Sequence, residues 1–169
     1  MSNMVNIKID GRDYQVEAGL TILEAAKKCG YKIPTLCYFK NLVQSGACRV
    51  CLVEVKGARS LLPSCNVVVT DGMEVSINST RAKNARKKAV ELILSNHNMD
   101  CLHCSRNQKC ELQTLAKTMN IEEDKYKGKV TPASFDKLSA ALVRDTSKCV
   151  LCGRCIAACE KYQGIGILG

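Results

Sequence analysis

Short stretches of alternating apolar and polar residues dominate the N-terminal part of the chain. Residues 4–9 alternate from Val5 onward, the Asp10-Gly11 pair follows as a turn signal, and residues 12–16 form the returning half of a hairpin. A further alternating stretch follows a group of cysteines in the middle of this region. The pattern predicts strands at residues 4–9, 12–16, 52–56, 67–69 and 75–77, the last two forming a closing hairpin around Asp71-Gly72.

Helical periodicity appears in three places. Thr21 and Glu24 form a capping-box pattern before an amphipathic segment that Gly30 ends. Ser79 or Thr80 can cap a second, longer segment. The predicted helices cover residues 22–29, 80–96 and 111–119. On the second helix, the basic residues are expected to lie mainly on a solvated face opposite the apolar one: Lys83, Arg86, Lys87 and Lys88.

The composition is that of a folded protein in a reducing compartment. Apolar residues make up 46% of 169 residues, which excludes a disordered chain, and no apolar run is long enough to cross a bilayer. No signal peptide precedes the first strand, which favours a cytoplasmic location. The 12 cysteines are therefore expected to bind metal or carry redox chemistry rather than form disulfides.

The formal net charge of +9 has several interpretations. It can be a solvated basic surface, it can guide an acidic electron-transfer partner, and metal clusters bound by thiolates would reduce it. A nucleic-acid partner is not expected, because no basic run is interleaved with aromatic residues, which are only 4% of the chain.

The first cysteine set has the spacing C-x10-C-x2-C followed by a fourth cysteine. Gly46 within it would let the backbone approach inorganic sulfide closely. A strand-rich frame with cysteines in this order suits a [2Fe–2S] centre, and structural zinc is the alternative, although zinc ribbons usually pair two C-x2-C knuckles. The predicted ligands are Cys37, Cys48, Cys51 and Cys65.

The second set follows the long helix with the spacing H-x3-C-x2-C-x5-C. Three thiolates and one neutral imidazole make a cluster less negative, and so easier to reduce, than four thiolates would. His103 competes with His97 for the ligand role, but it lies between two closely spaced cysteines and is expected to point away. The predicted ligands are His97, Cys101, Cys104 and Cys110.

The third set, C-x2-C-x2-C-x3-C, is the bacterial ferredoxin run for [4Fe–4S] centres. Cys149, Cys152 and Cys155 would bind one cluster, and Cys159, which is followed by Glu160 instead of the usual proline, would bind another. A partner run is missing, so the sequence looks like the front part of something longer. The third cluster then lacks its fourth ligand, takes it from Cys159, or is not assembled. Cys29 belongs to no set and is expected to be a buried free thiol.

Several stretches together resemble a known arrangement: I-P-T-L-C-Y, G-A-C-R-V-C-L-V-E-V, L-I-L-S-N-H-N-M-D-C, C-E-L-Q and V-R-D-T-S-K-C-V-L-C-G-R-C. The chain resembles the N-terminal portion of the [FeFe] hydrogenase catalytic subunit, most closely the version in electron-bifurcating, NAD(P)-linked hydrogenases. It is also similar to the large iron–sulfur subunit of complex I and of NAD-linked hydrogenases and formate dehydrogenases.

The resemblance implies an α+β protein of consecutive cluster domains. It implies a β-grasp [2Fe–2S] ferredoxin-like domain over 1–79, a helical [4Fe–4S] domain with one histidine ligand over 80–120, a connector over 121–138 and an incomplete bacterial ferredoxin-type domain over 139–169. The same ligand sets as above carry over residue by residue. The family's hydrogen-activating site lies outside this span, so no catalytic residue is assigned.

The expected function is a relay of single electrons between a flavin- or NAD(P)-linked partner subunit and a catalytic domain, most readily that of an [FeFe] hydrogenase. Partner iron–sulfur subunits and ferredoxin are also expected. The same module in a formate dehydrogenase or a complex I-like NADH dehydrogenase is the first alternative. A zinc-stabilised interaction module is the distant one, and it accounts poorly for the third cysteine run.

Overall fold

The computed structural model describes residues 3–122, 125–126, 128–130, 132, 134–139 and 142–168. The chain divides into two compact units, one formed by Met1–Arg86 with Cys152–Gly169 and the other by Lys87–Leu151. Each unit is considered by itself. The predicted division into domains at 79, 120 and 138 stays a prediction, and its connector contains residues 123, 124, 127, 131 and 133, which lie outside the described residues.

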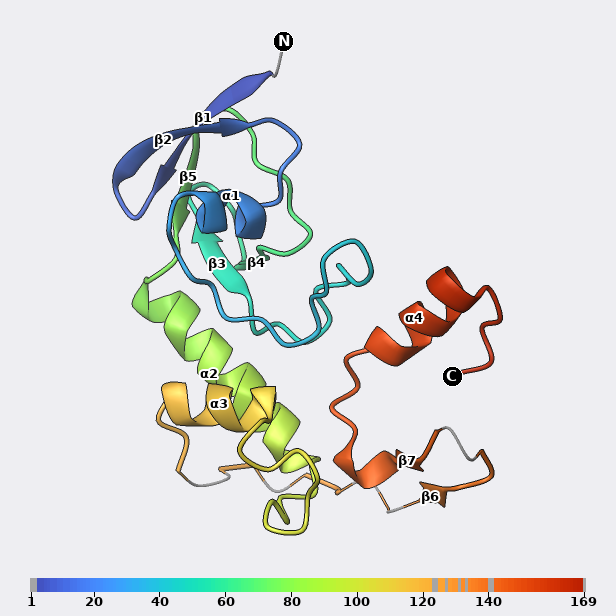
Figure 1. Cartoon of the computed structure of the whole chain (residues 1–169). Helices are drawn as coiled ribbons and strands as arrows, with labels where there is room; N and C mark the ends of the chain where they lie inside the picture. Colours follow the sequence, from blue (N-terminus) through green and yellow to red (C-terminus); the bar gives the residue numbers. More distant parts are fainter. Residues whose placement is uncertain are drawn as a thin grey trace. The chain divides into compact units, whose positions relative to one another are not determined.

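The first unit is built on a five-stranded mixed sheet with the order β2-β1-β5-β3-β4 (Figure 1). Strand β1 pairs antiparallel with β2 and parallel with β5, and β3 pairs antiparallel with both β5 and β4. The chain therefore returns across the sheet to place β5 between β1 and β3. The strands are β1 (Met4–Ile9), β2 (Arg12–Glu17), β3 (Leu52–Val55), β4 (Leu62–Pro63) and β5 (Met73–Ser76).

The predicted first hairpin is confirmed. Asp10 and Gly11 both have positive φ, at 46° and 84°, which a tight hairpin turn needs and which these residue types tolerate. The Asp10 carboxylate also accepts hydrogen bonds from the backbone of Ile77 at 2.7 Å and from the side chain of Asn78 at 2.9 Å. One residue thus shapes the turn and fixes the chain that leaves β5.

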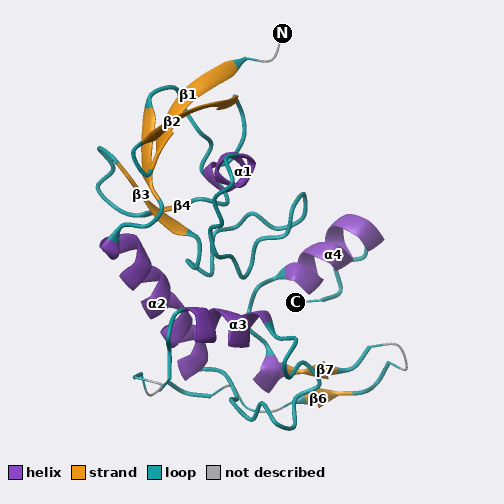
Figure 2. Cartoon of the chain, turned by 60° about the vertical axis from the view of Figure 1, so that its left-hand side comes forward, coloured by secondary structure: helices purple, strands orange, loops and turns teal. Residues whose placement is uncertain are grey.

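Helix α1 (Ile22–Lys28) covers one face of this sheet (Figure 2). The predicted capping box is present: the Thr21 hydroxyl accepts from the Glu24 amide at 3.2 Å, and a Glu24 carboxylate oxygen accepts from the Thr21 amide at 3.0 Å. The α1 residues Ile22, Ala25 and Ala26 are at most 1% exposed. Burial of this apolar stripe against the sheet stabilises a helix too short to persist alone.

The predicted hairpin of 67–69 with 75–77 is wrong. Val68 makes only an isolated bridge to Thr21, and the strand β5 pairs instead with β1 and β3. The apolar run at 67–69 lies against the start of α1, because Val67 and Val69 exchange backbone hydrogen bonds with Ile22 and Leu20. Local alternation could not reveal these partners, since both are more than 40 residues away in sequence.

Helix α2 (Thr80–Ser95) begins as predicted, with the Ser79 hydroxyl accepting from the Ala82 amide at 3.1 Å. Its buried face repeats every four residues through Ala82, Arg86, Val90 and Leu94. The expectation that Arg86 lies on the solvated face is wrong, because its side chain is only 5% exposed. Leu92 of the same helix, although apolar, is 53% exposed.

The second unit contains the end of α2, helix α3 (Glu111–Thr118), a two-stranded ribbon and a 3-10 turn. The ribbon pairs β6 (Phe135–Asp136) with β7 (Arg144–Asp145), which alternation in so short a stretch did not predict. The turn η1 (Thr146–Lys148) follows at once. Gly128, expected in the connector, packs so tightly that a Cβ would lie 2.7 Å from the Ser95 hydroxyl.

The last helix described, α4 (Arg154–Gln163), belongs to the first unit.

Within the described residues, none of the helices combines the length and apolar character that crossing a bilayer requires.

Thr21→Ala should lower the free energy of unfolding by about 1 kcal/mol, because it removes the hydroxyl of the capping box. Anaerobic urea unfolding followed by circular dichroism measures this change. Thr70→Ala is the matched control, since Thr70 is exposed and lies outside the helix. Its expected effect is within roughly 0.5 kcal/mol. Equal losses in both variants would contradict a stabilising role for the cap.

Candidate metal centres

The first cysteine set comes together inside the first unit, carried by three separate loops. Cys37 follows α1, Cys48 and Cys51 precede β3, and Cys65 follows β4. Cys51 and Cys65 are fully buried and Cys37 is 1% exposed, whereas Cys48 is partly exposed. Cysteine is small and apolar enough for this burial, but four thiols in one place need a chemical reason.

The four sulfurs influence one another directly. The Cys37 amide points at Cys48 Sγ at 3.5 Å. A hydrogen bond from the Cys65 thiol lowers the pKa of Cys51 to about 6, and the pKa of Cys65 is raised because the two sulfurs hold its proton between them. The charges of Cys37 and Cys48 raise the pKa of Cys65 further. The predicted set is therefore one cluster of thiols that lie within hydrogen-bonding reach of one another.

The backbone around these thiols is unusually tight. Gly46 has φ +66°, and a Cβ there would lie 3.1 Å from Pro63 Cβ and 3.3 Å from the Asn66 amide nitrogen. The Ser64 hydroxyl donates to the Cys51 carbonyl at 2.8 Å and so joins the second and third loops. Gly46 is thus required both by its φ and by the close approach of two cysteine loops.

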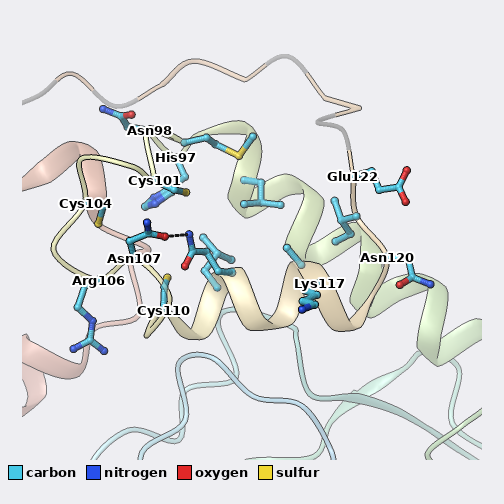
Figure 3. A pocket seen from close by; sticks show the side chains of 16 residues that line it. His97, Asn98, Cys101, Cys104, Arg106, Asn107, Cys110, Lys117, Asn120 and Glu122 are labelled. Atoms are coloured by element: carbon cyan, nitrogen blue, oxygen red, sulfur yellow. Dashed lines mark hydrogen bonds between the residues drawn. The ribbon is translucent and has the colours of Figure 1, made fainter.

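The second set lines one cavity of about 460 Å³ in the second unit. His97, Cys101, Cys104 and Cys110 all face it, and Figure 3 shows them gathered at one end. Apolar side chains of α2 and α3 also line the cavity, among them Leu94, Leu112 and Ala116, and Lys117, Asn120 and Glu122 lie at the end away from the cysteines (Figure 3). The predicted donors therefore meet in a space with a dry side, the kind of site in which a cluster's potential is set by its protein surroundings.

The two histidines of the chain have different environments. His97 Nδ1 is buried and has no hydrogen-bond partner among the described residues. Burial lowers the pKa of His97, and the positive charge of Lys148 lowers it further, so the imidazole is held in the neutral form that binds metals. His103 is 83% exposed at its side chain and pairs with Asp100 at 2.8 Å. It does not line the cavity, in agreement with the prediction that it points away.

Hydrogen bonds with Ser147 and Lys148, both distant in sequence, hold the loop that carries these ligands. The Asn98 amide donates to the Ser147 carbonyl at 3.2 Å. Lys148 Nζ donates to the Asn98 carbonyl at 3.4 Å and to the Asp100 carbonyl at 2.8 Å. Lys148 thus clamps the segment between His97 and Cys101, a role that sequence analysis did not detect because a lysine before a cysteine run carries no signal.

The third set is divided between the two units. Cys149 belongs to the second unit, where it is exposed and its Sγ accepts from the Leu151 amide at 3.4 Å. The other three cysteines belong to the first unit, at or before α4. Backbone amides of Leu168, Ile167 and Gly166 lower the pKa of Cys159, so this sulfur is prepared for the anionic form. The assignment of Cys149, Cys152, Cys155 and Cys159 as ligands stays a prediction.

Helix α4 contacts the first cysteine loop within its own unit. Arg154 Nη2 donates to the Tyr38 carbonyl at 3.1 Å and its Nε donates to the Cys37 carbonyl at 3.4 Å. Lys161 Nζ donates to the Leu42 carbonyl at 2.8 Å. These cations hold the Cys37 loop through its carbonyls, another contact that spacing along the chain does not reveal.

Within the part of the chain that the structure describes, no group of three or more His, Cys, Asp or Glu side chains is arranged around a single metal-ion position.

Two protein-family models match this chain. Residues 2–80 match the family model described as "2Fe-2S iron-sulfur cluster binding domain". Residues 86–125 match the model described as "NADH-ubiquinone oxidoreductase-G iron-sulfur binding region". The chain therefore contains a 2Fe–2S-binding and a 4Fe–4S-binding domain, which confirms the prediction of iron–sulfur cofactors.

Relatives cover almost the whole chain. It is 45% identical over 172 residues to "NADP-reducing hydrogenase subunit HndD" of Solidesulfovibrio fructosivorans, which spans 98% of this chain and 29% of that protein. It is 36% identical over 168 residues to a G-type subunit of NADH-quinone oxidoreductase from Rhizobium meliloti (strain 1021), covering 98% of this chain and 20% of that protein. The chain thus spans less than a third of the length of these curated relatives.

A solved structure shares the fold. A chain of the NAD+-reducing [NiFe]-hydrogenase in its H2-reduced state matches with a TM-score of 0.89 and 27% identity, over 98% of this chain and 69% of that chain. The chain is therefore an α+β iron–sulfur module of the type found in the G-type subunits of NADH-quinone oxidoreductases and in NAD(P)-reducing hydrogenases.

His97→Cys should lower the reduction potential of the second centre, because a thiolate places more negative charge on it than a neutral imidazole. An EPR-monitored redox titration of anaerobic protein measures the shift. His103→Gln serves as the control and should leave the potential unchanged, since His103 is exposed outside the cavity. A shift in the control but not in His97→Cys would show that the wrong histidine has been assigned.

Lys148→Met should make the second centre release iron about tenfold faster to a chelator, because the loop before Cys101 loses two hydrogen bonds. The loss of cluster absorbance with time under anaerobic conditions gives the rate. Lys109→Met removes an equal charge from an exposed position of the same unit and should have little effect. Identical rates in the two variants would contradict the clamp.

Proposed function

We propose that this chain relays single electrons between a flavin- or NAD(P)-linked partner subunit and a catalytic domain, the H2-activating domain of an [FeFe] hydrogenase being the first choice. The observation that carries the proposal is the cavity in which His97, Cys101, Cys104 and Cys110 meet, in a chain that also holds a separate buried set of four thiols. The 45% identity to the NADP-reducing hydrogenase subunit favours the hydrogenase context. Electron bifurcation is part of the proposal only as an implication of the sequence resemblance.

The ligand assignment is part of this proposal. Cys37, Cys48, Cys51 and Cys65 would hold a [2Fe–2S] cluster within a β-grasp domain, an interpretation supported by the sheet order β2-β1-β5-β3-β4 with α1 across it. His97, Cys101, Cys104 and Cys110 would hold a [4Fe–4S] cluster, and Cys149, Cys152 and Cys155, with Cys159, would serve further ones. When bound, such clusters supply reversible one-electron chemistry.

In this proposal the chain's own residues hold the clusters and tune their surroundings. They bind iron through thiolates and one neutral imidazole, exclude water with apolar walls and set the local charge. No general acid, base or nucleophile is needed for this role, so we propose that this span has no catalytic site of its own. Excess lysine and arginine would guide an acidic partner subunit or ferredoxin, and a cytoplasmic location remains the expectation.

An equivalent relay in a complex I-like NADH dehydrogenase is the second candidate. The match of residues 86–125 to the NADH-ubiquinone oxidoreductase-G region and the 36% identity to a subunit of an NADH-quinone oxidoreductase favour it. The two contexts differ in the catalytic domain that the module serves. Further cysteine motifs for an active-site cluster in the complete gene would indicate hydrogenase, and a pterin-binding domain would indicate formate dehydrogenase instead.

Anaerobically purified protein should contain iron and acid-labile sulfide, with about six irons if the first two sets are loaded and about ten if a third [4Fe–4S] centre forms. Its reduced EPR spectrum should show a [2Fe–2S] and a [4Fe–4S] signal. Simultaneous Cys37→Ser and Cys65→Ser substitutions should remove the first signal and keep the second. Zinc without acid-labile sulfide would overturn the proposal.

A further inference from the structure

A buried cation lies beside the first cysteine set. Arg86 on α2 is 5% exposed, although an isolated arginine on a helix is normally solvated. Its Nε donates to the Leu52 carbonyl at 2.6 Å. Leu52 directly follows Cys51, whose side chain is fully buried. The guanidinium is therefore anchored at the end of the loop that carries two of the four thiols.

The guanidinium of Arg86 does not find a hydrogen-bond acceptor for all of its N–H groups among the described residues. It has five N–H donors, and Nη2 is buried without a hydrogen-bond partner among the described residues. A buried charge with an unpaired donor is costly, so a compensating negative group is expected close by. Within the described part of the chain no carboxylate forms a salt bridge with Arg86.

The groups that would carry negative charge near Arg86 include a cysteine of the first set. Burial lowers the pKa of Arg86, and the charges of Cys51 and then Asp10 act against that shift. Asp10 is already bonded to Ile77 and to Asn78. On the other side, the Leu52 carbonyl that accepts from Arg86 directly follows Cys51, so a cluster bound by the first set would place its negative charge close to the guanidinium.

We propose that Arg86 is the internal counter-charge of the first cluster and raises its reduction potential. The inference rests on the proposed function, because it takes Cys37, Cys48, Cys51 and Cys65 as cluster ligands. Reduction adds one negative charge to the cluster, and a fixed cation nearby stabilises that charge. Because Arg86 is buried, solvent and salt screen this attraction far less than they screen surface charges.

The decisive measurement is the midpoint potential of the [2Fe–2S] EPR signal in anaerobic holoprotein. Arg86→Gln removes the charge and should move the potential to a more negative value. Arg86→Lys keeps the charge and should stay close to wild type. Arg81→Gln is the matched control on the same helix: Arg81 is 53% exposed at its side chain and pairs with Glu54, so its removal should shift the potential much less.

The outcomes separate this inference from the proposed function. Wild-type protein without a [2Fe–2S] signal or acid-labile sulfide would overturn the proposed function itself. A loaded Arg86→Gln variant whose potential equals that of Arg81→Gln would overturn only the role of Arg86, and so would a shift in Arg86→Lys as large as in Arg86→Gln.

Incomplete folding of one variant does not remove the test. If Arg86→Gln does not bind the cluster, Arg86→Met provides an apolar replacement of similar length. Failure of both neutral variants with normal loading of Arg86→Lys would support the need for a charge. Failure of all three would show that the arginine has a structural role, and the counter-charge proposal would be overturned.

Discussion

The gathering of four cysteine thiols at the edge of the core is the constraint on which the first unit is built. Three of its four clustered thiols are almost completely buried, and Cys51 and Cys65 belong to the same apolar cluster as Ile9 and Val53. Converting such thiols to thiolates inside a core is unfavourable unless a cationic centre shares their charge. The β3–β4 pairing and the hydrogen bond from the Leu23 amide of α1 to the Ser64 carbonyl already hold two of the three cysteine loops together, so a metal bound there would add to a frame that the fold supplies.

The ligand set predicted for the second unit would carry less negative charge than four thiolates. His97 takes the place of one cysteine in that set, and burial together with the positive charge of Lys148 lowers its pKa, which favours the neutral imidazole. Lys148 also fixes the ligand loop by donating to two of its carbonyls. One residue thus contributes to both the geometry and the electrostatics of the site, and it does so from 51 positions beyond His97 in the sequence. His103, between two of the cysteines, lies in solvent instead and pairs with Asp100.

The elements that could be predicted from sequence were those with a local cause. The Asp10-Gly11 turn, the Thr21 capping box and the Ser79 cap of α2 each depend on neighbouring residues, and all are present. The cysteine spacings also indicated which side chains would meet in the first two sets. The predictions that were wrong concerned contacts between residues far apart in the sequence. The 67–69 run pairs with the start of α1, and β5 inserts between β1 and β3, so tertiary pairing overrode local alternation.

Arg86 and Lys148 show why the surroundings of the centres were harder to predict than their ligands. A hydropathy pattern scores every arginine and lysine as polar and assigns it to solvent, so a buried cation looks the same as a surface one. What distinguishes Arg86 is its hydrogen bond to the Leu52 carbonyl, directly after Cys51, a residue that is 35 positions earlier in the chain and counts as apolar in the same pattern. Cysteine changes character once it binds metal, from a small apolar side chain to an anion. The side chains that favour its neighbourhood are then decided by charge rather than by hydropathy, and which cations lie near the cysteine can be read only from the three-dimensional structure.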